Sequence, residues 1–153
     1  MHLALESVDQ PDVIALIDAL DAYQGALYPP ESNYHLSVAE LKQANVLFTV
    51  VRDDDGTALA CGAVVLLDSY GELKRMYVSP AQRGRGIAMT IIEFLEHEAR
   101  RRECTNLRLE TGIHQAEAIS LYGRAGYERC ARYGDYPEDP LSVFMEKTIS
   151  RSA

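Results

Sequence analysis

Tryptophan is absent from the 153-residue sequence, and cysteine occurs only at Cys61, Cys104 and Cys130. The odd number and wide spacing of the cysteines exclude a CxxC redox pair and a zinc-binding pattern, so no metal is expected. They predict buried, free thiols in a cytoplasmic protein. No apolar run approaches the roughly 18 residues that a membrane-spanning helix requires. The first residues lack the basic and apolar regions of a signal peptide, so the sequence predicts neither a membrane protein nor a secreted one.

Basic residues are also scarce, because 15 Lys and Arg stand against 23 Asp and Glu, which gives a net charge of −8. A chain of this charge is repelled by nucleic acid and by anionic lipid, so neither is expected as a partner. Hydrophobic residues (47%) and charged residues (25%) are at the average for soluble globular proteins. The length, with no repeat and no linker, predicts a single domain over residues 1–153.

The spacing of apolar residues predicts alternating strands and helices. The predicted strands cover residues 2–8, 46–52, 58–68, 72–78, 106–110, 127–133 and 141–148, and the predicted helices begin at Pro11, Ser37, Gly84 and Gln115. Ser37 and Glu40 form a capping box, and the acidic turn at 53–56 predicts a hairpin. This order predicts a mixed sheet with helices packed on it, of the α/β or α+β class. The order lacks the regular alternation of a doubly wound nucleotide-binding fold.

The segment Arg83-Gly84-Arg85-Gly86-Ile87-Ala88 connects a predicted strand to a helix and concentrates positive charge in an acidic chain. Glycines at a helix start let backbone N–H groups approach a ligand closely. The helix dipole and the two arginines favour an anion there, so the segment predicts a site for a small polyanion. The alternative is that the glycines only shape a turn and the arginines are solvated, since short glycine motifs often match by chance.

Two nucleotide-binding motifs are excluded. The Walker A sequence is absent, and Met89 stands where a dinucleotide-binding motif needs its third glycine. The pattern Arg83-x-x-Gly86-x-Ala88 instead resembles the GNAT superfamily of acetyl-CoA-dependent N-acetyltransferases. The stretch 118–127, with Leu121-Tyr122 and Gly126-Tyr127, is similar to the second signature of that family. The resemblance covers residues 46–148 and includes features of a bacterial subgroup, but Gln115 stands where the family often has asparagine.

The resemblance implies a GNAT fold, with a mixed, mostly antiparallel sheet of about seven strands flanked by about four helices. It implies transfer of an acetyl group from acetyl-CoA to a primary amine of a small molecule, amino acid or peptide, by direct attack in a ternary complex. The family also allows a homodimer. The alternative is a non-catalytic acyl-CoA-binding sensor or regulatory module. The residues that the resemblance assigns to the coenzyme are Met76, Tyr77, Val78, Arg83, Gly84, Arg85, Gly86, Ile87, Ala88, Gln115 and Tyr122.

Two side chains are candidates for proton transfer. Glu72 matches the general base of the family, and its spacing from Met76 predicts that both side chains lie on one face of a strand. A surface carboxylate paired with Lys74 is the alternative, and Glu110 is the second candidate base. Tyr122 shares a helical face with apolar residues, which favours a place in the core. The resemblance implies instead that its hydroxyl protonates the coenzyme thiolate.

The acceptor is predicted to bind where polar and aromatic residues gather between the first two helices. The candidate substrate-binding residues are Tyr28, Ser32, Asn33 and His35 in that region, together with Glu110 and Tyr136. Such side chains suit recognition of a small amine or an amino acid. They suit an ordinary surface loop equally well.

Overall fold

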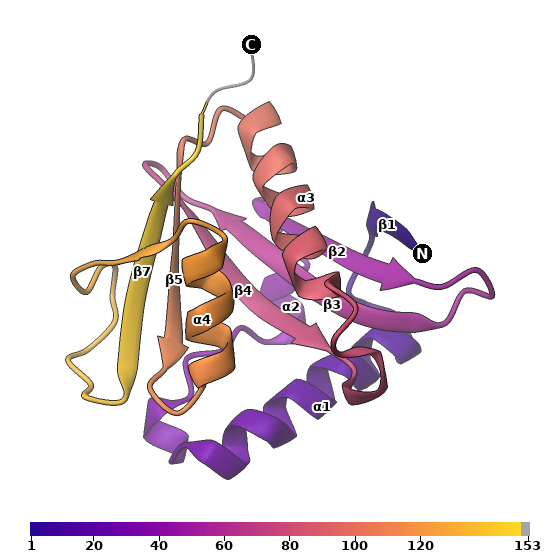
Figure 1. The fold of residues 1–153 in the computed structure, drawn as a ribbon, viewed down its shortest axis with the longest axis horizontal. Coiled ribbons are helices and arrows are strands. Elements are labelled where there is room, and N and C mark those ends of the chain that lie inside the picture. The colour runs from indigo at the N-terminus through magenta and orange to yellow at the C-terminus, as the bar shows by residue number, and fades with distance from the viewer. Residues whose placement is uncertain (151–153) are drawn as a thin grey trace.

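The computed structural model describes residues 1–150 as a seven-stranded sheet with helices on both faces (Figure 1). The strands are β1 (His2–Leu5), β2 (Val46–Arg52), β3 (Ala58–Leu66), β4 (Gly71–Val78), β5 (Asn106–Gly112), β6 (Glu128–Arg129) and β7 (Ser142–Thr148). The helices are α1 (Pro11–Leu27), α2 (Val38–Leu41), α3 (Ile87–Arg101) and α4 (Ala116–Arg124), and short 3₁₀ turns occur at Pro30–Ser32 and Pro80–Gln82. The sheet order is β1-β2-β3-β4-β5-β7-β6, and β4–β5 pair in parallel whereas the other neighbours pair antiparallel. The predicted mixed, mostly antiparallel fold is confirmed.

Several element boundaries differ from the prediction. Strands β1 and β3 end earlier than predicted, at Leu5 and Leu66, and α3 begins at Ile87, so 83–86 is a loop before the helix. The predicted strand 127–133 is reduced to the two residues of β6. The chain leaves the sheet there because the ring of Tyr133 turns inward and is only 7% exposed.

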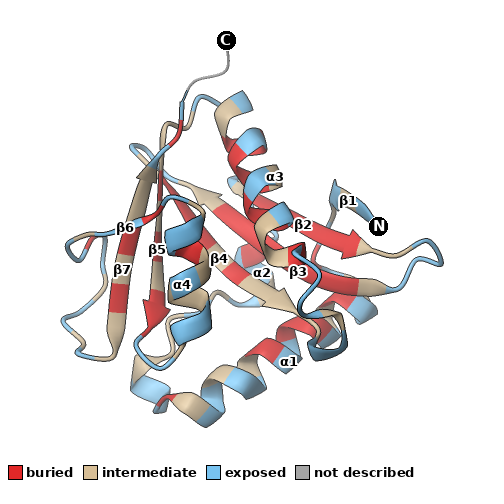
Figure 2. Ribbon diagram, viewed as in Figure 1, coloured by how far each residue is buried: buried red, intermediate tan, exposed pale blue. Residues whose placement is uncertain are grey.

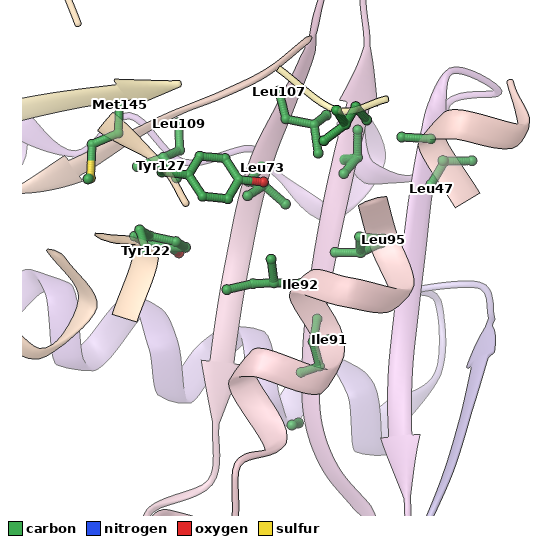
Figure 3. Close-up of a cluster of buried hydrophobic side chains, with 14 of the residues drawn as sticks. Leu47, Leu73, Ile91, Ile92, Leu95, Leu107, Leu109, Tyr122, Tyr127 and Met145 are labelled. Carbon is green, nitrogen blue, oxygen red and sulfur yellow. The ribbon is translucent and has the colours of Figure 1, made fainter. Parts of the chain in front are cut away.

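The core consists of two clusters, one on each face of the sheet. Buried residues are concentrated in the central strands and in α1 and α3 (Figure 2). On the α3 and α4 face, the fully buried Ile91, Ile92 and Leu95 point from α3 toward the central strands (Figure 3). On the opposite face, α1 packs Val13 and Ile17 against β2 and β3. The centre of the sheet is therefore buried on both sides and gives the site a rigid platform.

The three cysteines are free, as predicted, but only one of them is fully buried. Cys61 is buried in the cluster beside α1, and burial raises the pKa of its thiol to about 12. Cys104 and Cys130 are half-buried, which corrects the prediction that all three thiols are buried.

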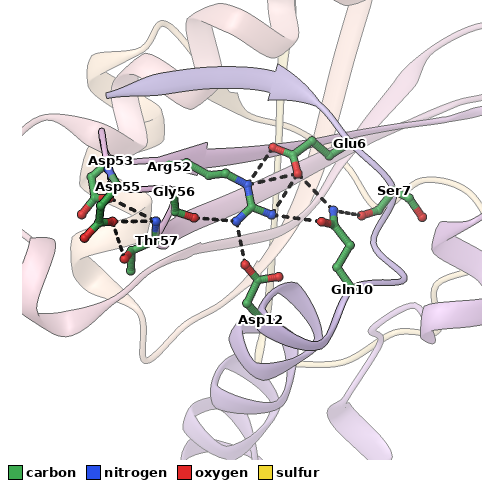
Figure 4. Close-up of polar contacts among 9 residues, drawn as sticks. All are labelled: Glu6, Ser7, Gln10, Asp12, Arg52, Asp53, Asp55, Gly56 and Thr57. Atoms are coloured by element: carbon green, nitrogen blue, oxygen red, sulfur yellow. Dashed lines mark hydrogen bonds and ion pairs between the residues drawn. The ribbon is translucent and has the colours of Figure 1, made fainter.

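A polar network around Arg52 connects the start of the chain to the β2–β3 hairpin (Figure 4). The guanidinium donates to Glu6 at 2.9–3.2 Å, to Asp12 at 2.6 Å and to the carbonyl of Gly56 at 2.8 Å. Hydrogen bonds from Arg52 lower the pKa of both carboxyl groups. This network fixes the entry to α1, the helix that covers one side of the cavity described below.

Strand β4 contains a β-bulge at Arg75. Its φ of +58° lies in the left-handed region, which is rare for a residue with a side chain. The register with β3 shifts there, since Ala63 pairs with Lys74 but Cys61 pairs with Tyr77. An extra residue on one strand reverses the alternation of the side chains that follow it.

The bulge corrects the prediction that Glu72 and Met76 share a face of the strand. Met76 packs into the cluster beneath α3, whereas Tyr77 packs into the cluster beside α1. Glu72 shares its face with Lys74, and Glu72 Oε1 lies 3.9 Å from Lys74 Nζ. The two predicted site residues therefore project from opposite faces of the sheet.

Candidate active site

Strands β4 and β5 pair only at residues 71–73 and 107–109 and then separate within the described chain. A cavity of about 890 Å³ extends from this point between the two strands, beneath α1 and beside α4. Where neighbouring strands separate, backbone N–H and C=O groups on the facing edges have no ladder partner and can bind an extended ligand. The separation of the strands thus provides both a space and hydrogen-bonding groups.

Most of the predicted site residues lie on the wall of this one cavity. They are Tyr28, Ser32, Asn33, His35, Met76, Tyr77, Val78, Arg83, Gly84, Gly86, Ile87, Ala88, Glu110, Gln115 and Tyr122. Arg85, Glu72 and Tyr136 are not among its lining residues. Segments 28–35, 76–88 and 110–122 are distant in sequence, so the fold brings them together.

Other wall residues were missed by the sequence reasoning. They are Tyr23, Gln24, Lys74, Arg75, Thr111 and His114, among others. Lys74 and Arg75 directly precede Met76, and their position in the same strand could have identified them as residues of the cavity wall. Lys74 follows the ordinary strand alternation from Glu72, whereas the orientation of Arg75 depends on the bulge, which the sequence pattern does not reveal.

The loop before α3 contains two glycines in the left-handed region. Gly84 and Gly86 have φ values of +82° and +75°, and Gly86 is the N-cap of the 15-residue helix. A Cβ at either glycine would meet no atom within 4 Å, so the backbone conformation rather than crowding requires glycine. Arg83 lies on the cavity wall, with its guanidinium 5.9 Å from the ring centroid of Tyr23. Arg85 turns instead to Gln82.

Tyr122 belongs to both the core and the cavity wall, so the two predictions for it are compatible. Its ring is 7% exposed and packs edge-on against Tyr127, with the ring centroids 6.0 Å apart (Figure 3). Burial raises the pKa of the hydroxyl, which therefore stays protonated at neutral pH. In the described residues that hydroxyl has no hydrogen-bond partner, and it is available to a ligand in the cavity.

Glu110 is the carboxylate on the cavity wall at the point where β5 begins to separate from β4. Its Oε2 accepts a hydrogen bond from Ser142 Oγ at 2.8 Å. Burial raises the pKa of Glu110 above its ordinary value, although the hydrogen bond from Ser142 opposes the shift. A raised carboxyl pKa brings a group closer to the range in which it can act as a base near neutral pH.

Glu72 does not line the cavity and instead contacts two tyrosines. Its side chain is buried, and Oε2 accepts hydrogen bonds from Tyr133 at 2.6 Å and from Tyr136 at 2.7 Å. Both tyrosines come from the 130–141 loop, where their rings pack edge-on with Phe144. Tyr136 is half-buried in this group, with its hydroxyl bonded to Glu72, and it lies off the cavity wall.

Tyr28 closes the end of the cavity near β5. Its hydroxyl accepts a hydrogen bond from the backbone N–H of His114 at 3.1 Å, and its ring stacks on the imidazole of His114 with centroids 5.5 Å apart. A Cβ at Gly112 would lie 1.8 Å from the hydroxyl oxygen of Tyr28, so this contact requires glycine.

Two loops meet over the same end of the cavity. Ser32 Oγ and Tyr34 Oη donate to Asp139 at 2.7 and 2.6 Å, which joins the loop after α1 to the 130–141 loop. Asn33 and His35 lie on the wall between these contacts, and His35 Nδ1 is 3.8 Å from Asp21. Of the polar residues predicted to receive the acceptor in this region, Ser32 and Tyr28 are held by side-chain hydrogen bonds.

Among residues 1–150, no group of three or more His, Cys, Asp or Glu side chains is arranged to hold a metal ion. Within the same range, none of the helices has the length and apolar character needed to cross a membrane.

Comparison with known proteins identifies the family. The sequence profile described as the acetyltransferase (GNAT) family matches residues 13–127, which include both the loop before α3 and the signature of α4. The chain belongs to the GNAT family. It is therefore an N-acetyltransferase, as its relatives also indicate.

Two relatives match over nearly their whole length. The IAA acetyltransferase of Azospirillum brasilense is 43% identical over 149 residues, which cover 96% of this chain and 97% of that protein. The uncharacterized N-acetyltransferase YsnE of Bacillus subtilis is 32% identical over 97% of this chain and 100% of its own length.

Solved structures share the fold of this GNAT protein. A Klebsiella pneumoniae protein assigned as an acyl-CoA N-acyltransferase superposes with a TM-score of 0.83 at 40% identity, covering 97% of both chains. An aminoglycoside 6′-N-acetyltransferase, solved in complex with coenzyme A, has a TM-score of 0.74 at 16% identity, covering 100% of this chain and 99% of that one. The second likeness concerns the fold alone.

Proposed function

We propose that this cytoplasmic enzyme transfers an acetyl group from acetyl-CoA to a primary amine of a small molecule, amino acid or peptide. One observation carries the proposal: a single cavity connects the loop before α3, the hydroxyl of Tyr122 and the carboxylate of Glu110. A coenzyme with a phosphate end and a thioester end needs an anion cradle at one position and proton-transfer groups at another.

The wall residues suit the parts of the coenzyme. Backbone N–H groups after Gly84 and Gly86, together with Arg83, would bind the pyrophosphate, since free N–H groups at a helix start favour anions. The backbone of Met76 to Val78, beyond the last pairing with β5, would bind the pantetheine arm as an added strand does. Acetyl-CoA supplies the activated acetyl thioester.

Glu110 and Tyr122 would move the protons of the reaction. As the new C–N bond forms and the C–S bond breaks, Glu110 accepts a proton from the amine and Tyr122 gives a proton to the departing sulfur. The products are the acetylated amine and free thiol, after which Glu110 loses its proton to solvent and Tyr122 regains one from solvent. We favour Glu110 over Glu72 as the base because Glu110 is on the cavity wall, whereas the Glu72 carboxylate already accepts two tyrosine hydroxyls. Glu72 remains the alternative base.

The test is amine-dependent release of free thiol from acetyl-CoA. We expect the wild-type enzyme to release thiol much faster with a suitable amine than without one. Coenzyme binding without any amine-dependent release would support the non-catalytic sensor instead. A thermal shift produced by ATP or NAD and not by coenzyme A would contradict the assignment of the cavity.

Replacing Gly86 with alanine should weaken coenzyme binding about tenfold. A residue with a Cβ costs about 1–2 kcal/mol in the left-handed region, so the loop leaves the geometry that points its N–H groups at the pyrophosphate. Calorimetric titration with coenzyme A measures the change. Gly123→Ala is the matched control, because Gly123 lies in α4, off the cavity wall, and a Cβ there would meet no atom within 4 Å. Equal affinity of the two variants would remove the loop from the site.

Arg83 and Arg85 are expected to differ although they lie two positions apart. Arg83→Ala should weaken coenzyme affinity about fivefold at low salt, because a charge-assisted contact to phosphate is lost. The loss should shrink at high salt, which screens exposed charges. Arg85→Ala is the matched control, since Arg85 is off the wall and bound to Gln82. The same titration would contradict the account if Arg85→Ala had the larger effect.

A further inference from the structure

Lys74 and Glu110 occupy equivalent positions on two neighbouring strands. Each lies one residue beyond the last parallel pair, which joins Leu73 of β4 to Leu109 of β5. Both side chains line the cavity, at the point where the strands begin to separate. Neighbouring strands are about 4.8 Å apart where they pair and farther apart beyond that point. In residues 1–150 these two groups form no ion pair with each other, although each is close enough to influence the pKa of the other.

The ammonium group of Lys74 is incompletely bonded. Its Nζ donates to the carbonyl of Tyr34 at 2.9 Å and to the hydroxyl of Tyr136, which uses two of three N–H donors. Lys74 forms an ion pair with Glu72, whose Oε1 lies 3.9 Å away, beyond hydrogen-bond distance. The two tyrosine hydroxyls bond the other oxygen of that carboxylate, Oε2. The Lys74 side chain is only 13% exposed, and this burial lowers its pKa. A ligand carboxylate in the cavity would supply the missing acceptor.

A second cation lies directly after Lys74 in the sequence and on the same wall. Arg75 is 6% exposed, and its Nη1 donates to Asp21 at 2.6 Å. Its Nε is buried and has no hydrogen-bond partner in the described residues. Buried donors in proteins are nearly always bonded, so Asp21 satisfies this guanidinium only in part.

Glu110 provides the complementary group. Its carboxylate makes one hydrogen bond, from the hydroxyl of Ser142, and no cation forms an ion pair with it in the described part of the chain. An acceptor amine would therefore find its own counter-charge at Glu110, next to the cations at Lys74 and Arg75.

We propose that the acceptor carries a carboxylate beside its amine, as an amino acid does, with Lys74 binding the carboxylate and Glu110 facing the amine. Arg75 adds positive charge behind Lys74. This inference rests on the proposed function and narrows its acceptor from primary amines in general to amino acids. The carboxylate and the amine of an amino acid would then lie between the oppositely charged Lys74 and Glu110.

The first test uses the wild-type enzyme and pairs of acceptors that differ only in the carboxylate. Amino acids with aromatic, aliphatic and basic side chains are each compared with the corresponding amino acid amide, which keeps the α-amine but has no negative charge. We expect kcat/KM to be about 10- to 100-fold higher for the best acid than for its amide, the effect of one charge-assisted hydrogen bond. Equal or higher values for the amides would overturn the inference.

The second test replaces the lysine. Lys74→Met keeps the length of the side chain without its charge, and it should reduce the preference for acid over amide to about one. Lys42→Met is the matched control, because Lys42 is an exposed lysine paired with Asp9, and it should keep the wild-type preference. Thermal unfolding confirms that each variant folds, and the wild-type comparison is decisive even if Lys74→Met does not fold.

The inference and the proposed function fail in different ways. If simple amines and amino acid amides are acetylated as fast as amino acids, the acetyltransferase activity is supported and the carboxylate site is contradicted. A different result would contradict the proposed reaction but support the carboxylate site. In that case no acceptor is acetylated, yet amino acids raise the melting temperature of the coenzyme-bound wild type more than their amides do.

Discussion

Tyr122→Phe is expected to lower kcat about 10²-fold, the usual contribution of one positioned acid. The phenylalanine ring fills the same place in the core, while the hydroxyl that would protonate the departing sulfur is removed. That hydroxyl has no partner in the described residues, so the free energy of unfolding should change by less than about 1 kcal/mol. Steady-state kinetics with a saturating acceptor and thermal unfolding measure the two effects.

Tyr127→Phe is the matched control for this prediction. Tyr127 packs edge-on against Tyr122, but its hydroxyl donates to the buried carboxylate of Glu96 at 2.9 Å. Removing that donor should cost about 1–3 kcal/mol of stability and leave kcat close to the wild-type value. The prediction is contradicted if wild type and Tyr122→Phe have equal kcat values when chemistry is shown to be rate-limiting. Tyr122 would then have a structural role, and water would be the proton donor.

Glu110→Gln should lower kcat/KM by at least about 10²-fold, because the amide cannot accept the amine proton. The pH dependence gives a sharper readout than the rate. A carboxylate base acts only when ionised, so the wild-type rate should rise with pH through the pKa of Glu110. Burial raises that pKa above the ordinary value of 4.5, so the rise should occur at higher pH than for an exposed glutamate. This rise, the acid limb of the pH profile, should disappear in Glu110→Gln.

Glu72→Gln separates the two candidate bases. Glutamine keeps an oxygen that can accept from Tyr133 and Tyr136, so the wall formed by the 130–141 loop should persist. We expect kcat/KM to fall less than about tenfold and the acid limb of the pH profile to remain. Loss of that limb in Glu72→Gln, with the limb retained in Glu110→Gln, would make Glu72 the base.

The part of the cavity that we propose for the coenzyme could be located from the sequence because its residues are close together along the chain. The loop at 83–88 contains its glycines and its arginines within one turn before a helix, and its φ values of +82° and +75° match the residue type. Tyr122 was found by the same kind of local pattern. The order of strands and helices along the chain also followed from the sequence, since each hairpin and helix start has its own signature.

The acceptor half could not be predicted to the same extent because it depends on contacts between distant segments. Regular alternation along β4 would put Glu72 and Met76 on the same face of the sheet. The bulge at Arg75 puts them on opposite faces, and the sequence does not indicate the unusual φ of that residue. The approach of Lys74 to Glu110 depends on the parallel pairing of β4 with β5, across a helix and its loops. The predicted strand at 127–133 failed for the same reason, because Tyr133 follows its hydrogen bond to Glu72 rather than the strand alternation.

Mass spectrometry of the products from isotope-labelled acetyl-CoA and a panel of amines and amino acids tests the central claim most directly. The account predicts a labelled N-acetyl product and free coenzyme A in equal amounts, with no label left on the protein, because the amine takes the acetyl group directly. Free coenzyme A without an acetylated acceptor, or label retained on the protein as an intermediate, would contradict it.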